Sequence, residues 1–361
     1  MNFNTIFLRS FRVLLLPFAA AYGLIVHLRN RFYDKKWIDS AQFNFPIICV
    51  GNIAVGGTGK SPMVEYIVEV LKKDFEIATL SRGYKRKTKG YALANAQTTA
   101  LEIGDEPMQF YQKNPDIAVA VGEERIVAIP QLLQDRPDLQ AIVLDDAFQH
   151  RTVRAGFNIL LTDYSNLYTR DYFLPTGDLR DETESTKRAS VIVVTKCPAD
   201  LTAEQKAAII LELDPAPFQK VFFTAIEYST PYHICNTDKK YQITTEDEVL
   251  LVCGIANPLP LKEYLLHSTH AYYQQDFSDH HIFSIDDLNE IMQKYESIPA
   301  DRKIILTTEK DAVRQIKFKE ELNNVPLFVI PIRHHFLFNE GAYFNEMLVD
   351  FVKHFKFNPE S

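Results

Sequence analysis

One glycine-rich stretch holds the residues best suited to chemistry: AVGGTGKSP, at 54–62, directly after an apolar run. Glycines in such a turn let backbone N–H groups converge on phosphate oxygens, because no side chains intervene. A lysine behind the last glycine reaches the β- and γ-phosphates, and the hydroxyl next to it ligates magnesium. The stretch therefore predicts a phosphate-binding loop (P-loop) for ATP and Mg²⁺, formed by Ala54, Val55, Gly56, Gly57, Thr58, Gly59, Lys60 and Ser61.

The surroundings of this stretch fit a P-loop with one departure. The strict pattern has glycine where this chain has Ala54. Pro62 suits the first turn of a helix, whose positive end would face the phosphates. The alternative is a chance glycine-rich turn. The apolar run before the stretch and the helical pattern after it count against that alternative.

A pair of acids closes the apolar run AIVLDD at 141–146. Open parallel α/β sheets carry their ligand groups at the carboxyl ends of strands. We therefore expect Asp145 to complete the magnesium shell opposite the P-loop, with Asp146 in the same corner. The alternative is a solvated pair of acids that opens a turn.

The elements that must position these residues alternate between strand-like and helix-like patterns. Continuous apolar runs bounded by loops, with helices between them, are typical of a parallel sheet covered on both faces. The predicted strands of this first set are 45–50, 76–80, 116–121, 141–146, 157–163 and 189–197, and 62–73 is a helix.

The pattern changes at 222–247, where alternating, polar strands predict an antiparallel β-ribbon. A second α/β set follows it. Its predicted strands and helices are 248–255, 258–267, 286–296, 303–308 and 326–332, with a last helix near 340–355 that suits either domain. The predicted organisation is an N-terminal helix at 1–40, a P-loop domain at 41–227, a ribbon linker at 228–247 and a smaller α/β domain at 248–361.

The N-terminal segment contains the apolar run VLLLPFAAAYGLIV between Arg12 and His27. The run is shorter than the twenty or so residues of a membrane-spanning helix. It also resembles a signal peptide, but export would separate an ATP-dependent enzyme from its nucleotide. A helix in the membrane interface accounts for both the apolar run and the flanking arginines. An ordinary core helix is the remaining alternative.

The distribution of charge favours an anionic surface as a partner. The net charge of −8 argues against a nucleic-acid binder. Basic residues nevertheless gather in 1–40 and 81–90, where they could meet anionic lipid or phosphate. No obligate protein partner is implied.

Eight motifs extend the P-loop into a family resemblance over nearly the whole chain. They are VGNIAVGGTGKSP at 50–62, LSRGYKR at 80–86, GDEP at 104–107, LDDAFQH at 144–150, LPTGDLRD at 174–181, GIANP at 254–258, FSDHHIF at 277–283 and TTEKDAVR at 307–314. In this order they resemble the tetraacyldisaccharide 4′-kinase family of lipid A biosynthesis. The resemblance implies transfer of the γ-phosphate of ATP to the 4′-hydroxyl of a tetraacylated glucosamine disaccharide 1-phosphate. It also implies a peripheral enzyme on the cytoplasmic face of the inner membrane of Gram-negative bacteria.

The same resemblance implies roles for individual residues. Asp105 would be the base that accepts the hydroxyl proton, with His280 as its partner and Lys60 on the phosphates. Glu106 would help to hold magnesium. The implied substrate contacts are Arg82, Tyr84, Arg125 (for the 1-phosphate), Asp146, Gln149, His150 and Arg180. The family usually has glycine at the position of Ala147. This chain therefore departs from the family pattern directly after Asp146.

The residues alone leave alternatives open. Asp105 before Pro107 would also suit a helix cap, and His280 an ordinary loop. The alternative class of function is a membrane-associated P-loop GTPase or ATPase switch. TKCPAD at 195–200 is similar to a guanine-reading NKxD motif, but its aspartate lies four residues past the lysine instead of two.

Overall fold

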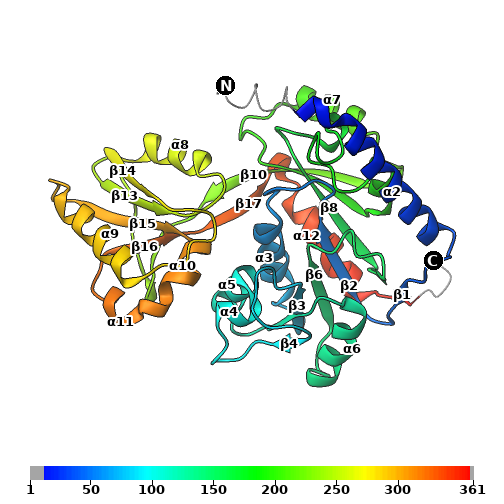
Figure 1. The fold of residues 1–361 in the computed structure, drawn as a ribbon, viewed down its shortest axis with the longest axis horizontal. Helices are drawn as coiled ribbons and strands as arrows, with labels where there is room; N and C mark the ends of the chain where they lie inside the picture. The colour runs from blue at the N-terminus through cyan, green and yellow to red at the C-terminus, as the bar shows by residue number, and fades with distance from the viewer. Residues whose placement is uncertain (1–11, 358–361) are drawn as a thin grey trace.

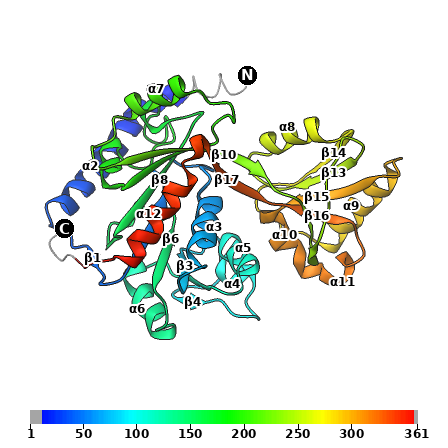
Figure 2. The ribbon, with the colours of Figure 1, turned by 180° about the vertical axis from the view of Figure 1, so that it is seen from behind.

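The computed structural model describes residues 12–357 and contains two large β-sheets (Figures 1 and 2). The larger sheet has nine strands in the order β17-β10-β9-β8-β2-β6-β3-β5-β4. Its inner strands pair in parallel, and only the edge strands β17 and β4 run antiparallel to their neighbours. The strands are β2 (Ile47–Gly51), β3 (Ile77–Ser81), β4 (Ala92–Leu93), β5 (Ala118–Val121), β6 (Ala141–Asp145), β8 (Phe157–Asp163), β9 (Val191–Thr195), β10 (Lys220–Tyr228) and β17 (Ile332–Phe336).

Helices cover both faces of the larger sheet, which confirms the predicted α/β sandwich. Residues of α3, α5 and α12 form one apolar cluster with the sheet, and residues of α6 and α7 form another on the opposite face. The strands between them are fully buried apolar runs such as Ile47–Gly51, as expected for a doubly covered sheet. The helices are α3 (Lys60–Leu71), α4 (Ala100–Ile103), α5 (Asp105–Lys113), α6 (Arg125–Asp135), α7 (Ala203–Leu213) and α12 (Gly341–Lys353).

The smaller sheet has six strands in the order β12-β11-β16-β15-β13-β14. Four of them are parallel, and β11 and β12 extend the sheet in antiparallel fashion. The strands are β11 (Tyr232–His233), β12 (Asn236–Lys240), β13 (Glu248–Cys253), β14 (Ala271–Asp276), β15 (Lys303–Thr308) and β16 (Leu327–Ile330). The helices are α8 (Leu259–Ser268), α9 (Ile285–Ser297), α10 (Glu309–Gln315) and α11 (Lys319–Leu322).

The connection between the two sheets lies elsewhere than the linker predicted at 228–247. The strands in that range, β11 and β12, belong to the smaller sheet. The two domains are joined by β10 and β17, which pair antiparallel and run between them in both views (Figures 1 and 2). A strand whose partner lies far along the chain leaves no local sequence pattern. The ribbon was therefore predicted at 228–247, whereas β10 and β17 form it.

The end of the chain returns to the larger domain. Helix α12 packs on the larger sheet through Phe344, Leu348 and Val352, in the same cluster as α3. With β17, it therefore extends the larger domain beyond the predicted 41–227. The smaller domain is an insertion between β10 and β17 rather than the whole of 248–361.

Helix α2 (Leu16–Asp34), preceded by a short 3₁₀ turn (Val13–Leu15), lies along the larger domain on the side away from the smaller one (Figures 1 and 2). The combined helix has 22 residues and a mean hydropathy of 1.4, so length and composition alone would let it cross a membrane. Its buried residues form one stripe: Ala19, Gly23, Val26, Asn30 and Tyr33. Large apolar side chains on the other faces, such as Phe18, Leu24 and Ile25, are exposed. Residues 1–11 of the predicted N-terminal segment lie outside the described part of the chain.

Candidate active site

The glycine-rich loop lies between the carboxyl end of β2 and the first turn of α3. Gly59 caps the helix with a positive φ of 83°, and Gly56 has a φ of 107°, conformations that favour glycine. A Cβ atom added at Gly56 or Gly57 would meet no atom within 4 Å. The loop is therefore open on the side where a phosphate chain can approach its backbone N–H groups.

Two side chains, from β9 and β17 of the same sheet, brace this loop. The Thr195 hydroxyl donates to the Thr58 carbonyl at 2.9 Å, and His334 Nε2 donates to the Gly59 carbonyl at 2.9 Å. The other ring nitrogen of His334 pairs with the Thr224 hydroxyl at 2.9 Å. Burial lowers the pKa of His334 to about 4, so the ring is neutral and its Nδ1 accepts the Thr224 proton. No role for His334 was predicted from the sequence, since β17 lies far from the loop along the chain.

The polar groups under the loop fit a phosphate chain. Lys60 Nζ donates to Asn52 Oδ1 at 3.2 Å and lies 3.8 Å from Asp146 Oδ1. Burial lowers the pKa of Lys60. Within the described residues, the buried Asn52 Nδ2 and Thr58 Oγ1 atoms have no hydrogen-bond partner. Unpaired buried donors are costly, and phosphate oxygens would satisfy both.

Asp146 and Arg180 form an ion pair beside Lys60. Arg180 Nη2 donates to Asn52 Oδ1 at 2.5 Å and to Asp146 Oδ1. Burial works against ionisation of Asp146, but Lys60 and Arg180 outweigh it and hold the pKa of that carboxyl below its usual range. Asp146 and Arg180, both predicted to contact the substrate, thus pair with each other beside Lys60.

Asp145 ends β6 and is buried. Burial, then the nearby charges of Asp146 and Glu106, raise its pKa to about 6. A divalent cation bound beside Asp145 would stabilise the ionised carboxylate and so offset the cost of burying its charge. Mg²⁺ keeps several waters and phosphate oxygens as ligands and takes only one or two ligands from the protein. Asp145 and the half-buried Ser61 hydroxyl at the start of α3 fit that mode.

Asp105 is the first residue of α5 and faces the smaller domain. Its Oδ2 atom accepts from His280 Nδ1 at 2.9 Å and from Arg314 at 3.0 Å (Nε) and 2.7 Å (Nη2). Burial would raise its pKa, but the hydrogen bonds from Arg314 and His280 outweigh burial and lower it. Asp105 is therefore a carboxylate at neutral pH. It is no mere helix cap, because its side chain joins two domains.

Further ion pairs connect α5 with α10 of the smaller domain. Glu106 accepts from Lys310 at 2.9 Å, and Lys113 bridges Glu65 at 2.5 Å and Glu309 at 2.6 Å. The charge of Lys310 acts on Lys60, and that of Glu106 acts on Asp145. The domain junction with Asp105 thus lies within electrostatic reach of the P-loop and its acids.

The remaining predicted contacts divide into exposed and buried groups. Arg82 and Tyr84 are exposed, and the Tyr84 ring lies 6.1 Å from that of His280. His150 is half-buried, and burial together with Arg125 and Arg82 lowers its pKa to about 4. Gln149 donates its amide to the backbone carbonyl of Asn52.

Arg125 is the predicted contact that the structure does not present to a ligand. Its exposed fraction is 0%, and it donates to the carbonyls of Gly122 at 2.5 Å and Asp145 at 3.2 Å. Because the guanidinium is enclosed, it holds the backbone of the acidic corner in this structure instead of receiving the 1-phosphate.

A hollow of about 220 Å³ lies on the outer side of the P-loop. Gly56 and Gly57 line one wall, and Asp163 and Lys196 line another. These last two form an ion pair at 2.7 Å, at the ends of β8 and β9. The segment that was similar to a guanine-reading motif therefore lies beside the P-loop.

Comparison with known families matches residues 11–353 to the tetraacyldisaccharide-1-P 4′-kinases. The chain belongs to this family. A tetraacyldisaccharide 4′-kinase of Flavobacterium johnsoniae is 44% identical over 345 residues, covering 95% of this chain and 97% of that protein. One from Bacteroides fragilis is 41% identical over 348 residues, covering 94% and 93%.

A solved structure agrees with the membership. The crystal structure of the "apo" form of LpxK from Aquifex aeolicus in complex with ATP is 26% identical and superposes with a TM-score of 0.72. The match covers 94% of this chain and 99% of that one. As a member of the tetraacyldisaccharide 4′-kinase family, the chain is a kinase, and the alternative of a GTPase or ATPase switch finds no support among these relatives.

Besides His334, two residues of the site were not assigned from sequence. Arg314 lies in the motif TTEKDAVR, which carried the resemblance without suggesting a role for the arginine. Lys310 of the same motif holds Glu106. A signal was present, since both basic residues follow a strand end at helical spacing, but only the fold shows that they face Asp105 and Glu106.

Proposed function

We propose that this kinase transfers the γ-phosphate of ATP to the 4′-hydroxyl of a tetraacylated glucosamine disaccharide 1-phosphate, a lipid A precursor. The observation that supports it most is the ionised Asp105 carboxylate. His280 and Arg314 hold it at the junction of the two domains, next in the chain to Glu106, whose charge acts on Asp145 beside the P-loop. An alcohol bound at that junction would lie between a proton acceptor and a triphosphate.

The P-loop is proposed to hold the donor. The backbone N–H groups of the glycine turn and the Lys60 ammonium would cover the phosphate charge, and the hollow beside Lys196 gives the nucleoside a place. Mg²⁺, held by Ser61 and Asp145 with Glu106 nearby, would supply charge neutralisation of the phosphate oxygens. Arg180 and Asp146 complete this corner next to Lys60.

Asp105 is proposed to act as the base. The acceptor oxygen forms its bond to the γ-phosphorus while the bond to the β,γ-bridging oxygen breaks, and ADP leaves. The hydroxyl proton passes to the carboxylate of Asp105, whose Oδ2 is already held by His280 and Arg314. A low pKa suffices, because phosphoryl transfer has a loose transition state and depends mainly on positioning and charge.

The exposed side chains around this junction are proposed to bind the acceptor headgroup. Arg82 offers its guanidinium to phosphate oxygens, and Tyr84 beside His280 offers an aromatic face to a sugar ring. The neutral His150 and the amide of Gln149 can exchange hydrogen bonds with sugar hydroxyls.

Helix α2 is proposed to place the enzyme on the cytoplasmic face of the inner membrane. Its outward faces carry exposed apolar residues, while its inner face contacts the larger domain. A helix held to the protein along one side suits a position in the membrane interface better than a span.

Two substitutions test the proposal. Lys60→Ala should reduce transfer from ATP to the lipid acceptor by about a hundredfold or more, because the phosphate charge loses its closest cation. Asp105→Ala should lower kcat strongly while the KM for ATP changes little, because its contact belongs to the transition state. Labelled ATP, purified protein and detergent-dispersed acceptor give both constants.

Circular dichroism and thermal unfolding of both variants serve as controls for folding. A folded Lys60→Ala enzyme with normal transfer would reject the P-loop assignment. A change confined to the KM for ATP in Asp105→Ala would reject Asp105 as the base. Acceptor-independent ATP hydrolysis at the full rate would contradict the lipid acceptor.

A further inference from the structure

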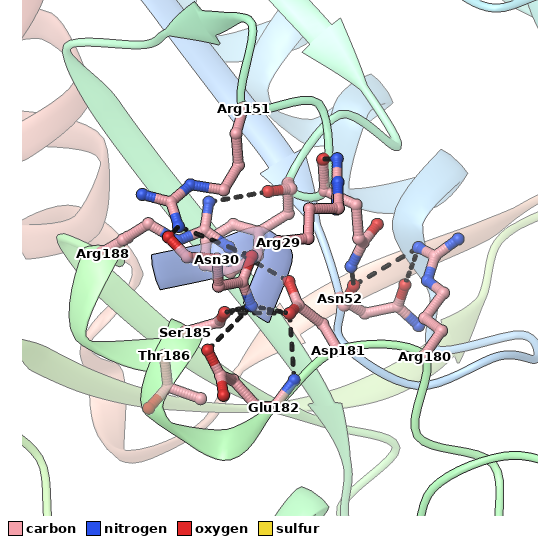
Figure 3. Close-up of polar contacts among 12 residues, drawn as sticks. Arg29, Asn30, Asn52, Arg151, Arg180, Asp181, Glu182, Ser185, Thr186 and Arg188 are labelled. Atoms are coloured by element: carbon pink, nitrogen blue, oxygen red, sulfur yellow. Dashed lines mark hydrogen bonds and ion pairs between the residues drawn. The ribbon is translucent and has the colours of Figure 1, made fainter. Parts of the chain in front are cut away.

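The inner face of α2 is polar at the point where it meets the larger domain (Figure 3). Asn30 is only 1% exposed, although the arginines on either side of it in the chain are exposed. Its amide nitrogen donates to Asp181 Oδ1 and Glu182 Oε1, both at 2.8 Å, and lies 3.3 Å from Ser185 Oγ. An apolar residue at this position could be buried without hydrogen-bond partners, so packing alone does not explain the asparagine.

The two acids that Asn30 holds directly follow Arg180 in the chain. Arg180 N donates to the Ile53 carbonyl at 2.8 Å, and the Arg180 carbonyl accepts from the Tyr22 hydroxyl of α2 at 3.1 Å. Its guanidinium reaches the pair Asn52 and Asp146 beside the P-loop. The backbone of Arg180 is thus fixed from the helix on one side and from the loop after β2 on the other.

Helix α2 also contacts the segment 149–151, which follows Asp146 in the chain. Arg29 donates to the Gln149 carbonyl at 2.9 Å, and Arg151 donates to the Asn30 carbonyl at 3.0 Å. Both segments that carry the Asp146–Arg180 pair therefore contact α2. Figure 3 shows Arg151 beside Asn30 of this helix, and Arg180 beside Asn52.

The acids at 181–182 need donors to stay in place. Asp181 is 1% exposed and Glu182 is 9% exposed. Arg188 donates to Asp181 Oδ2 at 3.2 Å, and His27 pairs with Glu182 at 2.8 Å. Asn30 is the group that bonds to both acids at once. Without it, two adjacent buried carboxylates would each lose a donor, and the segment after Arg180 would be held less firmly against α2.

We propose that Asn30 is a positioning residue for phosphoryl transfer, acting through Asp181 and Glu182 on Arg180. The inner face of α2 thereby sets the geometry of the phosphate-binding corner, while its outer face is the one proposed to contact the lipid surface. This inference rests on the proposed function, in which Arg180 covers phosphate charge.

A double-mutant cycle in the full chain tests the coupling. The variants are Asn30→Ala, Arg180→Ala and their combination, assayed with detergent-dispersed acceptor and saturating ATP. Asn30→Ala should lower kcat by about tenfold, with a much smaller change in the KM for ATP. In the Arg180→Ala background the same substitution should cost less than about twofold, because a positioning residue has nothing left to position.

Arg31, the exposed neighbour of Asn30, provides the matched control. Arg31→Ala should have the same effect on kcat in both backgrounds. If Asn30→Ala proves too unstable to purify, Tyr22→Phe replaces it in the cycle, since that change removes only the hydroxyl that bonds to the Arg180 carbonyl. Its loss of kcat should likewise shrink in the Arg180→Ala background.

Equal losses of kcat in both backgrounds, for Asn30→Ala or its replacement, would overturn the inference and leave α2 a structural element. If Arg180→Ala itself left kcat unchanged, the inference would also fall, while transfer that still required Lys60 and Asp105 would leave the proposed kinase function standing. The two failures are thus separable.

Discussion

At the scale of single residues, the Asp105 carboxylate is notable for how firmly its charge is fixed. Three donor atoms of His280 and Arg314 reach one carboxylate oxygen, so the proton acceptor stays ionised and oriented before any substrate arrives. Such preorganisation suits a reaction that depends on positioning more than on base strength. Arg314 comes from the smaller domain, so the state of the base depends on the contact between domains.

Arg314 should therefore control the acid side of the pH profile. Arg314→Gln removes the charge and hydrogen bonds that hold the pKa of Asp105 low, so this pKa should rise. The acid limb of kcat/KM should then move to higher pH, because more of the carboxyl is protonated at a given pH. Initial rates between pH 4 and 9 measure it. Arg314→Lys keeps a charge and should shift the limb less; an unmoved limb in Arg314→Gln would contradict the link to Asp105.

We predict that ionised, buried Asp145 lowers the stability of the folded protein at neutral pH. Its pKa is raised from 3.8 to about 6, so the folded protein binds this proton more tightly than the unfolded chain does. Stability is therefore lost as pH rises from about 4 to 6, by about 3 kcal/mol for a shift of this size. Asp145→Asn removes the penalty.

Thermal unfolding without nucleotide or metal tests this expectation. Asp145→Asn should raise the Tm by several degrees at pH 8, and the difference should vanish near pH 4. The same variant should lose most of its transfer activity. A lower Tm than the parent at pH 8 would show that ionised Asp145 is not the strained group.

The residues that sequence reasoning found are those in short, continuous motifs. Lys60 and its glycines follow from the chemistry of a phosphate-binding turn, and Asp105 and His280 follow from the family resemblance. His334 and Arg314 act on the same site through contacts between distant segments. No local pattern marks such contacts, so these two roles required the fold.

At the scale of elements, the contact between α5 and α10 joins the two domains through charge. Lys113 of α5 lies between Glu65 of α3 and Glu309 of α10. Burial, and then the charge of Glu309, raise the pKa of Glu65 to about 7. The lysine is thus the counter-charge that allows two carboxylates to approach each other at a domain boundary.

Replacing this lysine should weaken the junction. Lys113→Met leaves two mostly buried carboxylates without their cation, which costs about 3 kcal/mol or more. The Tm should fall, and adding Glu65→Gln should restore part of the loss, because one of the repelling charges is gone. Differential scanning calorimetry of the single and double variants checks both steps. The exposed Lys73→Met is the control; a Lys113→Met protein as stable as that control would refute the bridge.

The sequence predicted the strands of the larger sheet better than their connection. The runs around β2, β6, β8 and β9 are continuous and apolar, because both sheet faces are covered, and they were recognisable for that reason. The pairing of β10 with β17 depends on the path of the whole chain. It could not be deduced from the alternating pattern at 228–247.

At the scale of the whole molecule, the enzyme has one side that faces away from the smaller domain and is covered by α2. Leu24 is 59% exposed and Ile25 is 65% exposed, so water contacts apolar surface that a membrane would accept. The active-site corner lies behind the inner face of the same helix.

Substituting the outward residues should separate membrane binding from chemistry. The double variant Leu24→Ser, Ile25→Ser loses about 2 kcal/mol or more of apolar transfer energy and should partition at least about tenfold less onto vesicles with anionic lipid. Its kcat on detergent-dispersed acceptor should stay close to the parent value. Vesicle sedimentation measures the first quantity. Unchanged partitioning would mean that another surface makes the contact.

The return of the chain to the larger domain has a consequence for biosynthesis. Ribosomes synthesise a chain from its N-terminus. The glycine turn therefore emerges early, whereas His334 and α12 emerge near the end. Until they do, the apolar side of α3 that Phe344 and Leu348 cover stays open to water. A nascent chain therefore displays the apolar faces of α2 and an unfinished core together, which makes this stretch of translation the period when help from chaperones would matter most.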